Sequence, residues 1–217
     1  MVIEVSLIIP SQNADIKLHE LLRGIPNWEK VPNEIIIVDS SEKESIIPKD
    51  IELSIKKLNI GLLMIYENNL YPGHARNIGI SSASNSVLAF LDTSTQPTSK
   101  WLSGGLSIMN VKNSDGVWGK TYYQANTFSS KIFRACTFGT KPIRTFPGSI
   151  LNKKIFNRCG LFIESTRAGE DGDWMSRADL QEINVATPEE ILNYDQLNYM
   201  SIKKLIKKWF RNYKHTA

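Results

Sequence analysis

A turn, a helix-like segment, a buried strand and an acid follow one another between residues 71 and 97. The helical pattern over residues 74–83 precedes an apolar run over residues 87–91, and that run ends at Asp92. This order is one half of an α/β unit. In open α/β sheets, ligands bind in the crevice beyond the carboxyl ends of the strands. Asp92 is therefore the first candidate functional residue.

Strand and helix patterns alternate along much of the chain and predict one α/β domain with a mostly parallel sheet flanked by helices. Residues 5–10 and 34–38 are near-continuous apolar runs, typical of strands that are covered on both faces. The 217 residues, 41% hydrophobic and 22% charged, are an ordinary composition for one folded core. Residues 120–150 have no clear period, and we expect them to form the acceptor side of a site or a lid.

The two cysteines, Cys136 and Cys159, form no CxxC pair, which favours reduced and buried thiols in a cytoplasmic protein. The first apolar run has no basic segment before it, so it predicts a first strand and not a signal peptide. No stretch approaches the ~18 apolar residues of a transmembrane helix. We therefore expect a cytoplasmic protein, or one bound peripherally to the inner face of the membrane.

The excess positive charge lies in the C-terminal tail. Residues 201–217 contain six Lys and Arg residues and no acid, so the rest of the chain accounts for −2 of the total net charge of +4. A nucleic-acid surface would need basic residues distributed over the core. The distribution argues against a nucleic-acid partner.

The same tail predicts an amphipathic helix, which we separate as residues 196–217 from an α/β domain over residues 1–195. Its apolar residues lie on one helical stripe: Ile202, Leu205, Ile206, Trp209, Phe210 and Tyr213. A basic amphipathic helix with aromatic residues can lie on an anionic membrane surface. The stripe can equally pack on the protein's own core or on a second copy in a homo-oligomer, and the sequence leaves both interpretations open.

Acidic side chains follow the predicted strands at more than one place. Asp39 ends the second apolar strand as Asp92 ends a later one, and residues 170–173 form a further acidic group beside glycines. A single such acid can simply cap the next helix. Several acids gathered at one sheet edge would bind hydroxyl groups, a metal ion or both.

Taken in order, these segments resemble the family 2 glycosyltransferases, which have the nucleotide-sugar-binding GT-A fold. The resemblance covers about residues 3–180, and its ordered set of motifs is specific although each motif alone is weak. The matching segments are VSLIIPSQN at 5–13, EIIIVD at 34–39, GHARNIG at 73–79, AFLD at 89–92 with Pro97 and Trp101-Leu102, PGS at 147–149, GLFIE at 160–164, and GEDGDW at 169–174 with Arg177.

The resemblance implies transfer of a sugar from a nucleotide-diphosphate donor, UDP-linked by family frequency, to an acceptor hydroxyl, usually with inversion at the anomeric carbon. The implied acceptor is a glycan or a lipid-linked molecule, in glycan, glycolipid or cell-envelope polysaccharide synthesis. By family analogy, Pro10 and Asn13 line the nucleotide pocket, Asp39 holds the base or ribose, and Arg76 and Asp92 lie at the donor.

The resemblance also implies that Asp171 takes the proton of the acceptor hydroxyl. Aspartate is ionised at neutral pH unless it is strongly buried, which suits a general base. Glu170 is either a second catalytic acid or the residue that orients its neighbour. The alternative for both is a role at a helix N-terminus, where negative charge is favourable.

The sequence departs from the family's Asp-x-Asp metal motif, because it reads Asp92-Thr93-Ser94. Asp92 remains the candidate ligand for Mg²⁺ or Mn²⁺, while Ser94 offers only a neutral hydroxyl. Asp92 and the diphosphate can hold the ion, or basic side chains such as His74, Arg76 and Arg144 can replace it. Activity can also be low or absent, which would make the protein a sugar-nucleotide or glycan-binding module. We expect weak metal dependence.

Overall fold

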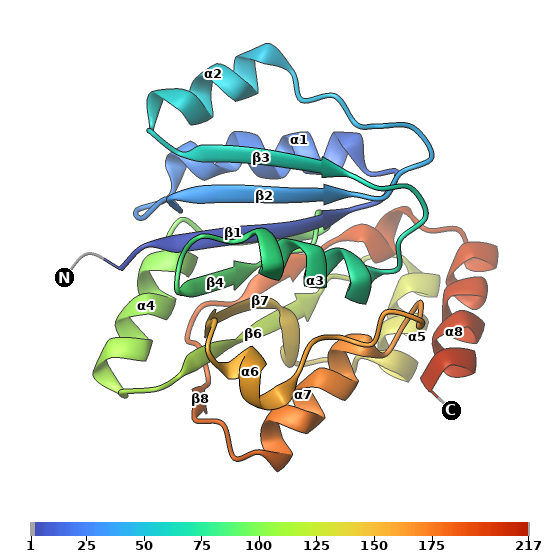
Figure 1. The fold of residues 1–217 in the computed structure, drawn as a ribbon. Coiled ribbons are helices and arrows are strands. Elements are labelled where there is room, and N and C mark those ends of the chain that lie inside the picture. The colour runs from blue at the N-terminus through green and yellow to red at the C-terminus, as the bar shows by residue number, and fades with distance from the viewer. Residues whose placement is uncertain (1–2, 217) are drawn as a thin grey trace.

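The structure is a computed structural model that describes residues 3–216, with side chains as far as Phe210. Helices cover both faces of a central sheet (Figure 1). The strands are β1 (Val5–Ser11), β2 (Glu34–Asp39), β3 (Gly61–Tyr66), β4 (Val87–Phe90), β5 (Thr95–Gln96), β6 (Gly116–Tyr123), β7 (Ile143–Asn152), β8 (Val185–Ala186) and β9 (Leu192–Tyr194). The helices are α1 (Asp15–Gly24), α2 (Lys49–Lys57), α3 (Pro72–Ser82), α4 (Trp101–Val111), α5 (Phe128–Thr137), α6 (Ile155–Cys159), α7 (Glu170–Leu180) and α8 (Ile202–Thr216).

The strand order is β3-β2-β1-β4-β7-β6-β9-β5, with β8 paired to β6. Strands β1 to β4 are parallel, which puts their carboxyl ends at one edge. Strand β7 runs antiparallel between β4 and β6. The predicted α/β fold with a mostly parallel sheet is thus confirmed. The sequence predicts a strand only at residues 150–151, where β7 has an apolar pattern, so the full length of β7 and its antiparallel direction were not predicted.

Alternate side chains of β1 enter two different cores. Leu7 and Ile9 pack with residues of α1, α2 and α4, whereas Ile8 packs with residues of α3, α6 and α7 on the other face. All three side chains are fully buried. This alternation explains why the strand is apolar throughout, since neighbouring side chains point to opposite faces and both faces are covered.

The region 120–150 contains more regular structure than its pattern indicates. Helix α5 begins with a capping box, in which Thr127 and Ser130 exchange hydrogen bonds. Cys136 on α5 is exposed, so the prediction of a buried thiol is wrong there, whereas Cys159 is buried as predicted. The amphipathic α5 turns only one face to the protein, and Cys136 lies on the other.

A third, small core joins α5 to the C-terminal helix α8 through Phe133, Leu197 and Leu205. Leu205 is 3% exposed, but Ile202, Ile206 and Phe210 remain 61%, 50% and 61% exposed. Tyr213 of the predicted stripe lies outside the described side chains. Helix α8 is therefore attached to the domain by one part of its stripe and leaves another part open to solvent. Within residues 3–216, no helix has the length and apolar character needed to span a membrane.

Candidate functional site

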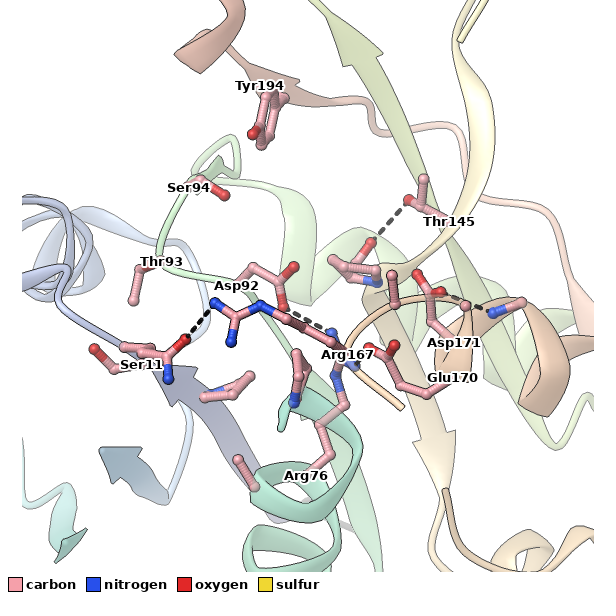
Figure 2. A pocket seen from close by; sticks show the side chains of 18 of the residues that line it. Ser11, Arg76, Asp92, Thr93, Ser94, Thr145, Arg167, Glu170, Asp171 and Tyr194 are labelled. Atoms are coloured by element: carbon pink, nitrogen blue, oxygen red, sulfur yellow. Dashed lines mark hydrogen bonds and ion pairs between the residues drawn. The ribbon is translucent and has the colours of Figure 1, made fainter. Parts of the chain in front are cut away.

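A cleft of about 630 Å³ opens beyond the carboxyl ends of β1 and β4 (Figure 2). Its lining comes from the ends of β1 and β2, the start of α3, the loop after β4, the end of β6, the residue after α5, part of β7, the start of α7 and the C-terminal region. Pro10, Arg76, Asp92, Ser94, Glu170 and Asp171 all line it. The structure thus brings together six residues that the sequence singled out.

Arg76 lies at the centre of this site, on α3, and is buried. Its Nη1 atom is 2.7 Å from Oε1 of Glu170, and its Nη2 atom is 3.0 Å from Oδ1 of Asp92. The rings of Phe146 and Phe162 each lie 5.6 Å from the guanidinium carbon. Arg76 therefore ties the loop after β4 to the start of α7 inside an apolar shell.

Burial and charge act in opposite directions on the pKa values of this network. Burial disfavours the charged form of Arg76, but the carboxylates of Asp92, Glu170 and Asp171 outweigh it and raise the pKa of the guanidinium. Burial raises the pKa of Glu170 above its usual value, although Arg76 opposes that effect. Arg76 is therefore a permanent cation, and one carboxylate oxygen of Glu170 is engaged by it.

The start of α7 positions Asp171 at the cleft. Gly169 precedes the helix with a φ of 90°, a left-handed conformation that favours glycine, and so the chain turns sharply before Glu170. Glu170 points inward to Arg76, whereas Asp171 is half-buried and lines the cleft. The Oδ1 atom of Asp171 accepts a hydrogen bond of 2.8 Å from the backbone N–H of Gly172. The two neighbouring acids thus have different environments.

The first turn of α3 approaches the segment before α7 closely. A Cβ atom on Gly73 would lie 2.3 Å from the carbonyl oxygen of Ile163, so only glycine fits without a shift. One turn later, the Asn77 side chain both donates to the carbonyl of Phe162, at 3.0 Å, and accepts from its N–H, at 2.9 Å. These contacts hold Arg76 and Glu170 at bonding distance, which explains part of the GHARNIG motif.

The loop after β4 offers a metal ion an incomplete set of ligands. Asp92 is the one carboxylate in the Asp92-Thr93-Ser94 segment, and its Oδ1 atom already accepts a hydrogen bond from Arg76. Among the described residues, no three His, Cys, Asp or Glu side chains are grouped so that they could hold a metal ion. The side chains therefore do not form a metal site by themselves, and an ion here would depend on donor phosphate oxygens.

Asp39 and Asn13 lie beside the cleft and not among the residues that line it. Asp39 is fully buried, and its carboxylate accepts hydrogen bonds from Ser41 and from the backbone N–H of Ser45 at 2.7 Å. The backbone N–H of Asn13 donates to the hydroxyl of Ser41 at 2.7 Å. Both residues shape the loop over residues 40–45, from which Ser40 lines the cleft.

Two of the candidate replacements for the metal do not line the cleft. Arg144 forms an exposed ion pair with Asp179, with an N–O distance of 2.7 Å. His74 lies 3.8 Å from Glu164. Neither side chain is among the residues that line the cleft, so the structure gives no support to either as a replacement for the metal ion. Their backbone positions direct them to Glu164 and Asp179, carboxylates that do not line the cleft.

Several cleft residues were not assigned a role from the sequence. They are Gln12, Tyr123, Arg167, Tyr194 and Lys208. Burial raises the pKa of Tyr123, and Tyr194, Asp92 and Asp171 raise it further, so its hydroxyl stays protonated at neutral pH. Arg167 reaches across the cleft toward the end of β1 (Figure 2), where its Nη2 atom is 3.5 Å from Oε1 of Gln12. Through Lys208, helix α8 contributes to the lining of the cleft.

Comparison with known proteins gives one matching family. The model of the family described as glycosyl transferase family 2 matches residues 6–163. The glycosyltransferase AglE of Haloferax volcanii is 28% identical over 122 residues, which are 55% of this chain and 40% of that protein.

Solved structures share the fold. TarS 1–349 of S. aureus, in complex with UDP-GlcNAc, has a TM-score of 0.62 and 18% identity, covering 89% of this chain and 56% of that one. The mannosyltransferase PcManGT of Pyrobaculum calidifontis, in complex with GDP-Man and Mn²⁺, has a TM-score of 0.63 and 15% identity, covering 98% and 61%. The chain thus spans less than two thirds of the length of each of these proteins.

Proposed function

Because this chain belongs to glycosyltransferase family 2, we propose that it transfers a sugar from a nucleoside-diphosphate donor to an acceptor hydroxyl. The observation that supports this proposal is the convergence of Asp92 and Asp171 on one cleft at the carboxyl ends of the parallel strands. The two acids belong to separate motifs, and the buried Arg76 links the motifs through Asp92 and Glu170. A cleft of about 630 Å³ is large enough for a nucleotide and a sugar.

The donor side of the cleft is formed by the end of β1 and the loop after β4. Pro10, Asp92 and Ser94 line it directly. Asp39 and Asn13 act on the donor through the loop that carries Ser40, which the hydrogen bonds of both residues shape. UDP is the proposed nucleotide by family frequency. The UDP-GlcNAc and GDP-Man in the complexes of TarS and PcManGT make UDP and GDP the two nucleotides to compare.

Asp171 is the proposed general base. It accepts the proton of the acceptor hydroxyl while the acceptor oxygen forms a bond to the anomeric carbon. On the opposite side of that carbon, the bond to the diphosphate oxygen breaks, and its electron pair leaves with the nucleoside diphosphate. Attack opposite the leaving group inverts the anomeric configuration. The contact of Glu170 with Arg76 supports a positioning role for Glu170 and not proton transfer.

Metal dependence is proposed to be weak. PcManGT is described with Mn²⁺, and a divalent ion bound in such a site would neutralise charge on the diphosphate. In this chain Asp92 is the candidate ligand, and Ser94 gives it little support. We therefore propose that cationic side chains neutralise part of the negative charge of the diphosphate.

The acceptor is proposed to be a glycan or a lipid-linked molecule at an anionic membrane surface, in polysaccharide synthesis on the cytoplasmic side. Helix α8 supports this location, because Ile202, Ile206 and Phe210 are exposed and the lysines at 203, 204 and 207 are exposed beside them. Exposed apolar residues flanked by lysines match the requirements of an interfacial helix.

A panel of UDP- and GDP-sugars tests the proposed function. The purified chain should be stabilised against thermal unfolding by its own donor, and it should release nucleoside diphosphate from that donor when the acceptor is present. Stabilisation without any release, with or without Mn²⁺, would favour the alternative that Ser94 suggests, a module that binds sugar nucleotides without catalysis. Neither stabilisation nor release with any donor would contradict the proposal.

A further inference from the structure

Some of the charged side chains that line the cleft already form ion pairs with one another. Arg76 is paired with Asp92 and Glu170 at 3.0 and 2.7 Å. A nucleoside diphosphate adds two or three negative charges, and its departure concentrates charge on the diphosphate. Since Arg76 is occupied and the protein's metal ligands are incomplete, the incoming charge needs another partner.

Two further cations line the same cleft, Arg167 and Lys208. In the described part of the chain, neither has a carboxylate within ion-pair distance. Both residues, together with Tyr194, also line the adjoining cavity beside α8. Arg167 and Lys208 therefore lie where the cleft meets the cavity beside the C-terminal helix.

Lys208 is held at this edge by a defined set of contacts. Its Nζ atom donates a hydrogen bond of 2.9 Å to the hydroxyl of Tyr194. It also lies 5.0 Å from the centre of the Tyr194 ring, a distance at which a cation is attracted to the aromatic face. Leu205, one turn earlier on the same face of α8, is buried against the domain. The helix thus has an apolar anchor and presents Lys208 beside it.

Tyr194 in turn lies next to the altered metal motif. In the pairing of β5 with β9, Tyr194 is opposite Thr95, the residue after Ser94. Figure 2 shows the Tyr194 and Ser94 side chains on the same side of the cleft. The Tyr194 ring packs on Tyr123 with centroids 5.0 Å apart, and Tyr123 stacks on Phe138 at 3.8 Å. This aromatic stack holds the Tyr194 ring, and with it the ammonium group of Lys208, in the lining of the cleft to which Ser94 also belongs.

We propose that Lys208 and Arg167 together bind the diphosphate of the donor and neutralise the leaving nucleoside diphosphate in place of a tightly held metal ion. Tyr194 is the positioning residue for Lys208. This inference rests on the proposed function and adds the residues that replace the missing metal ligand. It also makes the C-terminal helix α8 a part of the active site.

The experiment measures how much the second phosphate contributes to binding. Calorimetric titrations in EDTA compare UDP with UMP, and GDP with GMP, on the full 217-residue chain without lipid. In the wild type, the preferred diphosphate should bind about tenfold or more tightly than its monophosphate, since a charge-assisted hydrogen bond contributes an effect of that size. The Lys208→Gln variant should lose most of this preference for the diphosphate. The double variant, Lys208→Gln with Arg167→Gln, should show a still smaller preference.

Three other variants separate charge from structure. Lys208→Arg keeps the cation and should retain most of the preference, while Tyr194→Phe removes the hydroxyl that holds Lys208 and should reduce the preference in part. Lys204→Gln removes an equal charge from the same helix, outside the residues that line the cleft, and should leave the preference unchanged. Thermal unfolding of each variant checks that α8 remains packed.

The inference is overturned if the wild type in EDTA does not distinguish diphosphate from monophosphate, or if Lys208→Gln distinguishes them as well as the wild type does. Either result leaves the proposed sugar transfer intact, because the protein could still bind its nucleoside-diphosphate donor when Mn²⁺ is present. A protein that binds neither UDP nor GDP, with or without Mn²⁺, would overturn both.

Discussion

Arg76 and Glu170 are 94 residues apart in the chain, yet their side chains form a buried ion pair with a distance of 2.7 Å between Nη1 and Oε1. The pair joins α3 to the first residue of α7 and so fixes where Asp171 enters the cleft. Removing one member of a buried pair leaves the other charge without compensation. The pair is therefore a determinant of both stability and site geometry.

Arg76→Met should lower the free energy of unfolding by about 3–5 kcal/mol at neutral pH. Without Arg76, the buried Glu170 must either stay charged or take up a proton, and burial already raises its pKa. The folded variant then binds more protons than the unfolded chain, so its stability should fall as pH rises above the usual glutamate pKa. The loss relative to wild type should be smaller at pH 5 than at pH 7.5 in urea unfolding.

The matched control for this change is Arg144→Met, which breaks the exposed ion pair with Asp179. Exposed pairs contribute at most about 1 kcal/mol. Equal losses for the two variants would show that the Arg76 pair has no special structural role.

Asp171→Asn should reduce turnover by about 10²- to 10⁴-fold, because it keeps the shape of the side chain and removes the basic oxygen. Donor affinity, measured by calorimetry, should change little. Asp173→Asn is the control, since Asp173 is paired with Arg177 at 2.8 Å and does not line the cleft. If the Asp171→Asn variant kept most of its turnover, the general base would have to be another group.

Asp39→Ala and Asp92→Ala should each weaken nucleoside-diphosphate binding by about 1–3 kcal/mol. The two changes should differ in their effect on folding. Asp39 holds Ser41 and Ser45 from a fully buried position, so its loss should also lower the melting temperature, whereas Asp92 is partly exposed. Asp50→Ala, in an exposed pair with Arg23, is the control. Unchanged affinity in folded Asp39→Ala would remove Asp39 from the donor site.

Ser94→Asp should tighten Mn²⁺ binding in the presence of UDP or GDP, because it supplies a second carboxylate near Asp92. Calorimetric titration of Mn²⁺ into the nucleotide-bound protein measures the change, with Ser94→Asn as a neutral control. The expectation fails if the wild type already binds Mn²⁺ tightly and loses all activity in a chelator.

The full-length chain should float with anionic liposomes at low salt and less at high salt, since each basic residue near the surface contributes about 1 kcal/mol. Ile202→Ser combined with Ile206→Ser should reduce the salt-resistant part without unfolding the domain, because both side chains are exposed while Leu205 holds α8. Leu53→Ser on α2, 58% exposed, is the control. If wild type ignores anionic liposomes, the exposed stripe belongs to a protein contact.

Much of the central sheet and several residues that line the cleft could be predicted from local patterns. The apolar runs at 5–10 and 34–38 are buried on both faces, and such runs need no knowledge of distant residues to be recognised. Asp92 follows the same logic, because a parallel strand ends at the edge where the cleft forms. Asp171 was identified by its glycine-flanked motif together with the family resemblance, and Gly169 does adopt the backbone conformation that only glycine reaches easily.

The contacts between distant segments were decided only by the tertiary structure. The GHARNIG motif singles out Arg76, but only the folded chain shows that Arg76 pairs inside the protein while Arg144 pairs at the surface. Lys208 has the sequence setting of any lysine on an amphipathic helix, yet the burial of Leu205 and the pairing of β9 with β5 bring it to the cleft. Helical and strand periods specify which residues share a face. Which face meets which depends on the packing of the whole chain, and that packing assembles the charges of this site.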